Sequence, residues 1–283
     1  MMKIMISAVG GSVAISYIQH LQKLGHYVIG IDMNDDIPGK HFCDEFHKVD
    51  PCHPGYINDI DYDLFFPFID EELLLCMNDG RIIQCNYETN MTCINKHFLY
   101  QYCITHDIKV PTLSSVMDKY GFVRGIYSRG SKEAFLTTDF RQYMLNGKYI
   151  VQKFIQGIEY TIDCLVNSNG EFIFCVPRKR VNFTNVSLQG EIDMRQDLID
   201  FTKDIVSKIK FKGPINIQVI VRDNEIYLIE INPRLAGSAI FSIMAGFDII
   251  KDSIDIWSGN YYKSDYNIKD KKKVYRYLTE WSD

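Results

Sequence analysis

Three polar residues interrupt the apolar segment YLIEINPRLAGS (residues 227–238) at a spacing that suggests chemistry. Glu230 and Asn232 lie two positions apart, so in a β-strand both side chains point to the same face. Arg234 follows a proline, where the strand is expected to end. The apolar neighbours disfavour the alternative of a polar edge strand in solvent. A carboxylate and a carboxamide on one face are oxygen ligands suited to Mg²⁺, and a guanidinium can bind a phosphate or carboxylate through two hydrogen bonds.

The preceding residues, GPINIQVIVR (213–222), predict the partner strand of a β-hairpin. A three-residue loop at 223–225 would pair Arg222 with Ile226. In that register Gln218 lies opposite Glu230, and cross-strand partners share a face with side chains about 5 Å apart. We therefore expect a magnesium site, completed by substrate phosphates, whose protein ligands are Gln218, Glu230 and Asn232.

The N-terminal third must supply the other wall of such a site. Apolar runs at 3–9 and 27–31 flank a segment, 12–24, with apolar residues at helical spacing, which is typical of a βαβ unit with a parallel sheet. The Gly10-Gly11 turn and Asp32 also suggest a dinucleotide site, but the last glycine of that fingerprint is missing. We expect the turn to bind an anionic group of a substrate instead, because N–H groups at a helix start favour anions.

The order of the remaining elements predicts an α/β part followed by an α+β part. Residues 63–74 predict a short strand, a turn and a helix capped by Asp70, and 81–85 a further strand. From residue 112 the pattern changes to hairpins, with turns at 156–157 and 169–170. Further helices are predicted at about 92–105, 192–210, 238–246 and 248–258.

Composition narrows the class of protein. The net charge of −5 argues against a nucleic-acid surface, and the basic run 271–273 predicts a solvated terminal helix. No apolar run reaches the ~18 residues of a membrane span, and the glycine turn in the apolar start argues against an export signal. Eight cysteines without a CxxC pair predict reduced thiols in a cytoplasmic protein. The histidines and cysteines at 41–53 match no common zinc pattern.

Taken in chain order, these segments resemble the ATP-grasp superfamily, and most closely its carbamoyl-phosphate-synthase-large-subunit-like short forms and carboxylate–amine ligases. The resemblance covers roughly residues 1–260 and is most specific in GPINIQ…YLIEINPR. It implies a Rossmann-like N-terminal domain at 1–95 and an ATP-grasp domain at 96–283, with a small lid at about 112–155.

The resemblance also implies roles for single residues. In the family, the positions matching the predicted ligands hold one or two Mg²⁺ ions, or Mn²⁺, between the phosphates of ATP. Arg234 would steady the transferred phosphoryl group, and Arg178 and Arg180 would lie near the phosphates. Segments resembling the family's (N/D)K helix, its adenine hinge and the following strand imply further nucleotide contacts from Lys96, Gln152, Lys153, Phe154, Ile155 and Glu159.

The lid departs from the family pattern. The family places a lysine at a strand end and then a glycine- and serine-rich loop that cradles phosphate with backbone N–H groups. In YGFVRGIYSRGSKEAF (120–135), Arg124 stands in the place of the lysine, and only YSRGS remains of the loop. We therefore expect Arg124 to bind the nucleotide phosphates through its charge.

These features predict an ATP- and Mg²⁺-dependent ligase that activates a small carboxylate as an acyl phosphate for attack by an amine. Such a reaction needs positioning and charge neutralisation rather than an enzyme nucleophile. The expected partners are small-molecule substrates, and a homodimer is left open. Two alternatives remain: an ATP-grasp kinase that releases a phosphorylated product, and a nucleotide-binding protein without turnover, which the shortened lid loop suggests.

Overall fold

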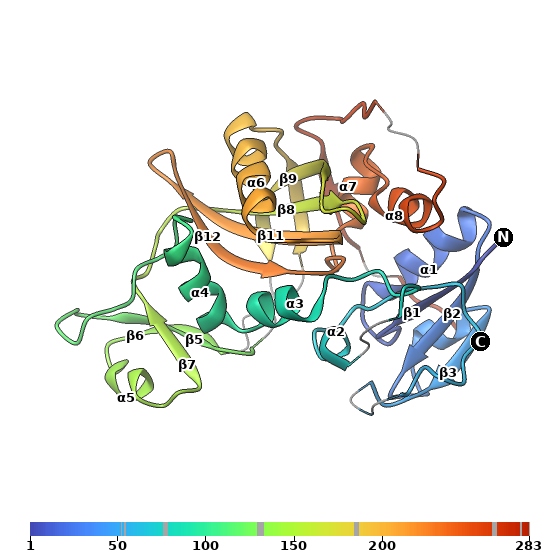
Figure 1. Cartoon of the computed structure of the whole chain (residues 1–283), viewed down its shortest axis with the longest axis horizontal. Coiled ribbons are helices and arrows are strands. Elements are labelled where there is room, and N and C mark those ends of the chain that lie inside the picture. Colours follow the sequence, from blue (N-terminus) through green and yellow to red (C-terminus); the bar gives the residue numbers. More distant parts are fainter. Residues whose placement is uncertain are drawn as a thin grey trace.

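The computed structural model describes residues 1–51, 53, 55–75, 79–128, 133–183, 187–261, 265–277 and 279–282, without the side chains of 182 and 183. The strands within these ranges form sheets of four, six and three strands. Figure 1 shows the sheets side by side along the long axis of the molecule, with the six-stranded sheet in the middle. No helix in the described ranges is long and apolar enough to cross a membrane. The sheets therefore meet at two junctions where a site can form.

The N-terminal sheet is parallel and has the order β3-β2-β1-β4. Its strands are β1 (Lys3–Ser7), β2 (Tyr27–Asp32), β3 (Glu45–Lys48) and β4 (Leu64–Phe66). Helix α1 (Ala14–Lys23) connects β1 to β2 and buries Tyr17, Ile18 and Leu21 against the core. A 3-10 turn, η1 (Pro38–His41), precedes β3. The predicted βαβ unit is confirmed.

Three details of this region differ from the prediction. Residues 81–85 form no strand, since only an isolated parallel bridge joins Phe65 to Ile82. The predicted helix at 92–105 is two helices, α3 (Tyr87–Ile94) and α4 (Lys96–Thr105), after the short α2 (Glu72–Leu75). Asn95 separates α3 from α4 because its backbone is extended and its side chain accepts hydrogen bonds from the N–H groups of His97 and Phe98. Lys96 thereby becomes the first residue of α4.

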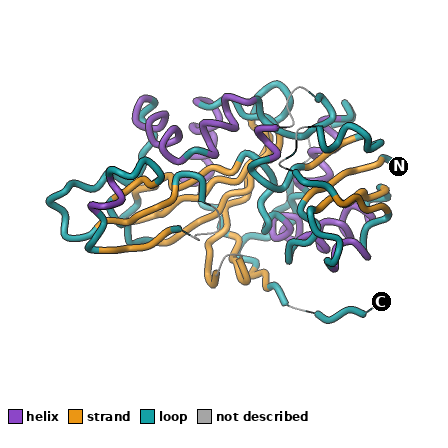
Figure 2. Tube along the Cα trace, turned by 90° about the horizontal axis from the view of Figure 1, so that it is seen from below, coloured by secondary structure: helices purple, strands orange, loops and turns teal. Residues whose placement is uncertain are grey.

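The central sheet has the order β12-β11-β8-β9-β10-β13, and all its strand pairs are antiparallel. Its strands are β8 (Ile158–Val166), β9 (Phe172–Phe183), β10 (Ser187–Ile192), β11 (Gly213–Arg222), β12 (Glu225–Asn232) and β13 (Lys273–Tyr275). Helix α6 (Gln196–Lys208) covers one face, where Leu198, Ile205 and Val206 join the core with residues of α3 and α4. Figure 2 shows this layer of helices on one side of the strands. The opposite face is left for other elements and for a cavity.

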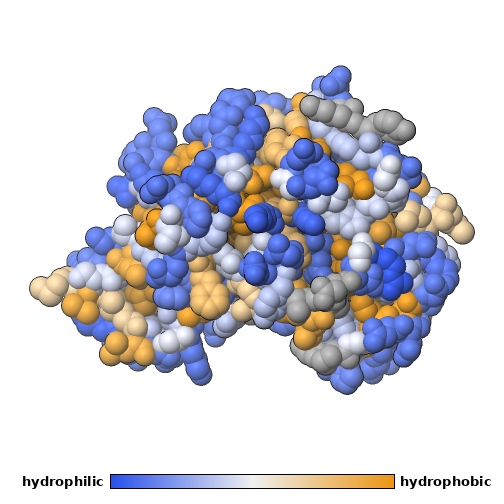
Figure 3. All heavy atoms as spheres, in the orientation of Figure 1, coloured by the Kyte–Doolittle hydropathy of each residue, from blue (hydrophilic) through white to orange (hydrophobic). Residues whose placement is uncertain are grey.

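The small sheet belongs to the predicted lid and has the order β6-β5-β7. Its strands are β5 (Gly121–Gly125), β6 (Ala134–Thr137) and β7 (Tyr149–Gln152), with the short helix α5 (Arg141–Met144) before β7. The predicted hairpin turn at 156–157 is wrong, because β7 pairs with β5 whereas β8 pairs with β9 and β11. Residues 153–157 therefore cross from the small sheet to the central one. In Figure 3 the surface is indented between the part that carries the small sheet and the part that carries the N-terminal sheet.

The C-terminal segment runs back to the N-terminal sheet. After α7 (Ile240–Ala245) and α8 (Ile249–Trp257), β13 pairs with β10, so the predicted terminal helix at 271–273 is wrong. Further on, the ring of Trp281 lies 4.8 Å from that of His41 and 5.4 Å from that of Phe42. Both termini lie beside the N-terminal sheet (Figures 1 and 2). The six cysteines among the described residues are all free thiols.

Candidate functional site

The hairpin β11–β12 presents the predicted metal ligands. Gln218 pairs with Glu230, as predicted, but the predicted loop is wrong, because Arg222 pairs with Glu225 around a two-residue turn. Both turn residues, at 223 and 224, have positive φ, which is typical of tight hairpin turns. A β-bulge between the partners of Gln218 and Val219 adds one residue to β12 and offsets the shorter loop. The extra residue is Ile229.

A cavity of about 180 Å³ lies between this hairpin, the small sheet and the crossover at 153–157. We call it the hinge cavity. It brings together every predicted nucleotide-binding residue and two of the three predicted metal ligands. The predicted site residues that line the cavity are Lys96, Arg124, Gln152, Lys153, Phe154, Ile155, Glu159, Gln218 and Glu230. The third predicted ligand, Asn232, is 9% exposed and does not line it.

Arg124 reaches from β5 to the hairpin and is only 7% exposed. Its guanidinium donates to the carbonyl oxygen of Ile229 at 2.8 Å and to Glu230 Oε2 at 3.2 Å. Burial lowers the pKa of Arg124, and the charge of Glu230 opposes that shift. The bulge and the neighbouring carboxylate are thus both bound by the arginine of the lid.

Lys96 enters the hinge cavity from the first turn of α4. Its Nζ donates to the carbonyl oxygen of Ser128 at 2.6 Å, and burial lowers its pKa. Ser128 is the second residue of YSRGS, the remnant of the predicted loop. Residues 129–132 of that loop lie outside the described residues. Two cations, Lys96 and Arg124, therefore converge on the side of the cavity where phosphates would enter.

The crossover at 153–157 has the form of a backbone recognition segment. Gln152 Nε2 donates to the carbonyl oxygen of Pro111 at 3.1 Å, and the N–H of Lys153 donates to that of Thr112 at 2.8 Å. Within the described chain, the N–H of Ile155 and the carbonyl of Lys153 form no hydrogen bond. One backbone donor and one acceptor thus remain available beside the aromatic ring of Phe154.

The donor set of the hairpin fits a hard cation. Glu230 supplies a carboxylate, Gln218 supplies an amide oxygen directly opposite, and Asn232 follows on the same strand face. Among the described residues no group of three or more histidine, cysteine, aspartate or glutamate side chains could hold a metal alone. Mg²⁺ keeps waters and commonly takes substrate phosphates as ligands, so a site with one carboxylate suits Mg²⁺ with a nucleotide.

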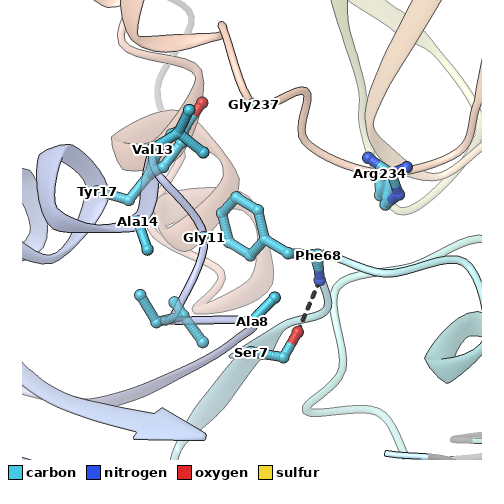
Figure 4. A pocket seen from close by; sticks show the side chains of 10 residues that line it. Ser7, Ala8, Gly11, Val13, Ala14, Tyr17, Phe68, Arg234 and Gly237 are labelled. Atoms are coloured by element: carbon cyan, nitrogen blue, oxygen red, sulfur yellow. Dashed lines mark hydrogen bonds between the residues drawn. The ribbon is translucent and has the colours of Figure 1, made fainter. Parts of the chain in front are cut away.

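A second cavity, of about 200 Å³, lies between the N-terminal sheet and the loop after β12 (Figure 4). We call it the turn cavity. Gly11 lines one wall and Arg234 the other, and the ring of Phe68 projects between them. Arg234 Nε donates to Asp70 at 2.6 Å, so Asp70 anchors the guanidinium. The predicted glycine turn and Arg234 therefore share one cavity.

The glycine turn has internal partners as well. The N–H of Gly10 donates to Asp32 Oδ2 at 2.9 Å, and that of Gly11 donates to the carbonyl of Ala8. An anion at the turn would thus have to use the N–H groups that follow, at the start of α1. Anion binding by this turn remains a prediction.

Arg178 lies elsewhere. It is 1% exposed, lines neither cavity, and forms a two-pronged ion pair with Asp163 at 2.9–3.1 Å. Asp163 also accepts from Asn216 Nδ2 at 2.9 Å and from Ser242. This position is that of a buried structural network, and a contact between Arg178 and the phosphates remains a prediction. Arg180 is paired with Glu159, which lines the hinge cavity.

Two residues of this region were missed by sequence reasoning. Asp163 is a single carboxylate in the apolar strand segment YTIDCLV, and a buried charge in such a strand signals a partner. Glu72 lies in the helix predicted within residues 63–74, where no role was predicted for it, but it is fully buried and accepts a hydrogen bond from Ser7 Oγ. Burial raises the pKa of Glu72 to about 7, against the opposing effects of Ser7 and Tyr56.

This buried acid should make stability depend on pH. An unfolded glutamate ionises near pH 4.3, whereas folded Glu72 does so near pH 7. The contribution of Glu72 to the free energy of unfolding should therefore fall as pH rises from about 4 to about 7, by about 3–4 kcal/mol, and stay level above that range. Glu72→Gln should remove this component, and Glu71→Gln should keep it. Urea unfolding between pH 4.5 and 8 measures both. Parallel pH profiles for wild type and Glu72→Gln would contradict the assignment.

Comparison with known proteins is consistent with this geometry. Residues 146–280 match a family model described as ATP-grasp in the biosynthetic pathway with Ter operon. The carbamoyl phosphate synthase arginine-specific large chain of Halalkalibacterium halodurans is 28% identical over 126 residues, which is 39% of this chain and 12% of that protein. The large chain of Clostridium acetobutylicum is also 28% identical, over 40% of this chain and 12% of its own length. The chain thus spans about an eighth of the length of these curated relatives.

Solved structures share the fold over almost the whole chain. N5-carboxyaminoimidazole synthetase from Staphylococcus aureus, complexed with ADP, superposes with a TM-score of 0.76 at 17% identity, covering 94% of this chain and 80% of that one. A biotin carboxylase–β,γ-ATP complex from Campylobacter jejuni superposes with a TM-score of 0.69 at 15% identity, covering 93% and 72%. The predicted fold class, α/β followed by α+β, is confirmed. The predicted domain boundary at 95/96 remains a prediction.

Proposed function

We propose that this chain, whose residues 146–280 match an ATP-grasp family model, uses ATP and Mg²⁺ to activate a small carboxylate as an acyl phosphate, which an amine then attacks. One observation carries the proposal: the hinge cavity joins two cations, a hairpin of oxygen ligands and a free backbone donor and acceptor. The adjoining turn cavity adds Arg234, where an acceptor carboxylate could be held.

The hinge cavity offers a distinct group to each part of ATP. The N–H of Ile155 and the carbonyl of Lys153 match the acceptor and donor on the edge of adenine, and Phe154 can cover its face. Glu159 can accept from the ribose hydroxyls. Lys96 and Arg124 would neutralise phosphate charge, which is the main contribution a protein makes to phosphoryl transfer.

The hairpin would hold the metal next to those phosphates. Glu230, Gln218 and Asn232 are the residues we assign to Mg²⁺, which when bound would neutralise charge on the β- and γ-phosphates. Arg124 already binds Glu230, so it lies within reach of both the carboxylate and the phosphates.

The reaction follows from this arrangement. A carboxylate oxygen of the acceptor attacks the γ-phosphorus, the bond to the β-phosphate oxygen breaks, and ADP leaves. The amine then attacks the carbonyl carbon, and phosphate departs with the electron pair of the broken C–O bond. Arg234 would steady the carboxylate and then the acyl phosphate by charge-assisted hydrogen bonds. Positioning supplies the remaining rate enhancement, so no side chain needs to act as a nucleophile.

A substrate screen tests the proposal. The protein is incubated with Mg²⁺ and ATP and a panel of amino acids and small carboxylates, with and without amines, and ADP release is measured. A ligase should release ADP steadily only when both a carboxylate and an amine are present. Steady release without any amine would favour the kinase, and tight ATP binding without ADP release on any substrate would favour a nucleotide-binding protein.

Arg124 provides a second test. Arg124→Ala should weaken ATP binding by about tenfold or more, because a charge-assisted hydrogen bond contributes about 1.5–3 kcal/mol. Arg124→Lys should keep most of the affinity. The control is Arg141→Ala, which removes an exposed arginine from the same lid. ATP titrations at one salt concentration measure all three variants. Wild-type affinity in both Arg124 variants would remove this residue from the site and favour the nucleotide-binding alternative.

A further inference from the structure

In the proposed reaction the turn cavity holds the acceptor carboxylate, and the wall of this cavity is mostly apolar. Val13, Phe68 and Gly237 form a part of the wall that a ligand can reach, since all three residues are partly accessible. Among the described residues that line the cavity, Arg234 alone has a charged side chain. The turn cavity thus joins one cation to an apolar surface.

The other polar side chains of the described wall, Ser7 and Tyr17, are already engaged. Ser7 Oγ donates to Glu72 and accepts from the N–H of Phe68 at 2.8 Å. The hydroxyl of Tyr17 donates to the carbonyl oxygen of Ala236. Burying a charged or polar group without a partner is unfavourable. A ligand with a second charge would find no side chain on this wall to receive it.

Arg234 keeps donors for a single carboxylate. Its Nε donates to Asp70 at 2.6 Å, and the two side chains are 14% and 13% exposed. Its terminal nitrogens form only long hydrogen bonds within the described chain, at 3.3 Å to the carbonyl oxygen of Leu235 and at 3.5 Å to Asn232 Oδ1. A guanidinium has N–H donors on all three nitrogens, and two of them can bind one carboxylate side by side.

The shape of the turn cavity sets the length of the ligand. Arg234 lies at one end, Val13 lies at the other, and the ring of Phe68 lies between them (Figure 4). An apolar cavity of about 150 Å³ binds benzene. At about 200 Å³, the turn cavity has room for a chain of about six carbons along the ring of Phe68.

We propose that the turn cavity selects an apolar monocarboxylate of about six carbons, whose carboxylate binds Arg234 and whose uncharged end lies against Val13 and Gly237. This inference rests on the proposed ligase function, to which it adds the class of the acceptor substrate. It disfavours acceptors with a second charge at the far end of the chain, because that charge would lie against apolar side chains.

Probes with the same carbon chain separate the two ends of the ligand: hexanoate, adipate, 6-aminohexanoate and hexanol. Each is titrated into the full chain without nucleotide and followed by calorimetry. Hexanoate should bind wild type with a dissociation constant on the order of 1 mM, as suits a ligand of so few atoms. Adipate and 6-aminohexanoate add a charge at the far end, and hexanol lacks the carboxylate. All three should therefore bind at least about tenfold more weakly than hexanoate.

Gly237→Val tests the apolar end by narrowing the cavity. A Cβ at Gly237 would lie 3.4 Å from Val13 Cγ2, which is an ordinary contact, so the side chain fills space that the ligand would use. Hexanoate binding should weaken at least about tenfold, with wild-type circular dichroism. The control is Gly80→Val, at an exposed glycine whose Cβ would have no neighbour within 4 Å, and it should bind like wild type.

Val13→Lys tests the same end by a gain of binding. The new ammonium gives the second carboxylate of adipate a partner, so adipate binding should strengthen at least about tenfold relative to wild type. The control is Gln19→Lys, which adds the same charge at an exposed position of α1 outside the cavity. Adipate binding should not change in this control.

Several outcomes would overturn the inference. One is the absence of hexanoate binding by wild type at about 10 mM. Another is equal or stronger binding of adipate, which would mean that the glycine turn holds a second anion. Equal hexanoate binding by Gly237→Val and Gly80→Val would place the ligand elsewhere.

The screen for ADP release is independent of these titrations, which contain no ATP. If polar carboxylates yield ADP while hexanoate does not bind, the apolar acceptor is wrong and the ligase proposal stands. If hexanoate binds with the expected pattern while no carboxylate yields ADP, the ligase proposal fails and the turn cavity remains a site for an apolar acid.

Discussion

Exchange of Glu230 for glutamine is expected to lower ADP formation by about 100-fold or more. Glu230 is the only carboxylate of the hairpin that lines the hinge cavity, where it lies opposite Gln218. The glutamine keeps the shape of the side chain and removes the charge that attracts Mg²⁺. ADP release at saturating ATP, repeated over a range of Mg²⁺ concentrations, measures the loss and shows whether more metal restores activity.

The control for this variant is Glu225→Gln in the same hairpin. Glu225 is exposed and pairs with Lys109 at the turn, far from the hinge cavity along the strand. Its loss should leave ADP release within about twofold, since exposed ion pairs contribute little. Wild-type activity in Glu230→Gln would mean that another residue holds the metal.

Arg178→Met is expected to lower the free energy of unfolding by about 3–5 kcal/mol. The substitution leaves the buried carboxylate of Asp163 without its cation, although Asn216 and Ser242 still donate to it. Urea unfolding measures the change. The neighbouring Lys179→Met on the same strand should change stability by less than about 1 kcal/mol.

A second substitution separates the ion pair from a catalytic role. The double variant Arg178→Met/Asp163→Leu should recover part of the lost stability, because it removes the stranded charge, although Asn216 loses its acceptor. In Arg178→Lys, which can fold with a partial pair, ATP affinity should stay within about twofold of wild type. A larger loss of ATP affinity in a folded Arg178→Lys protein would return Arg178 to the phosphate site.

The hairpin shows why strand patterns predicted the site better than the loops did. The alternation of apolar and polar residues along β12 predicted the face on which Glu230 lies. Burial of the opposite face in the core fixes the register, which places Glu230 across from Gln218. The loop was predicted one residue too long, and a bulge at Ile229 offsets the difference. The face on which a strand residue lies is constrained by burial of the whole strand. A bulge depends instead on local contacts, such as the hydrogen bond from Arg124 to the carbonyl oxygen of Ile229.

The parts that the sequence did not reveal join residues far apart along the chain. Arg234 pairs with Asp70, 164 positions away, and Asp70 was predicted only as a helix cap. Arg178 is charged, and its neighbours resemble phosphate-binding segments. Only the fold reveals that its partner is the buried carboxylate of Asp163. The break at Asn95 depends on a side-chain cap that competes with helix continuation, and local propensity does not decide between the two.

One of the two edge strands of the central sheet, β13, also has a consequence for association between molecules. An open sheet edge offers unpaired backbone groups to a second chain, which leads to aggregation. Next to β10 the edge is β13, only three residues long, which begins in the basic run at 271–273, whereas β12 forms the other edge of the sheet. Short edge strands and lysines both discourage such pairing, because a second strand gains few hydrogen bonds and meets like charge. A form of the chain shortened before residue 273 would expose the longer β10 as the new edge and lose this protection.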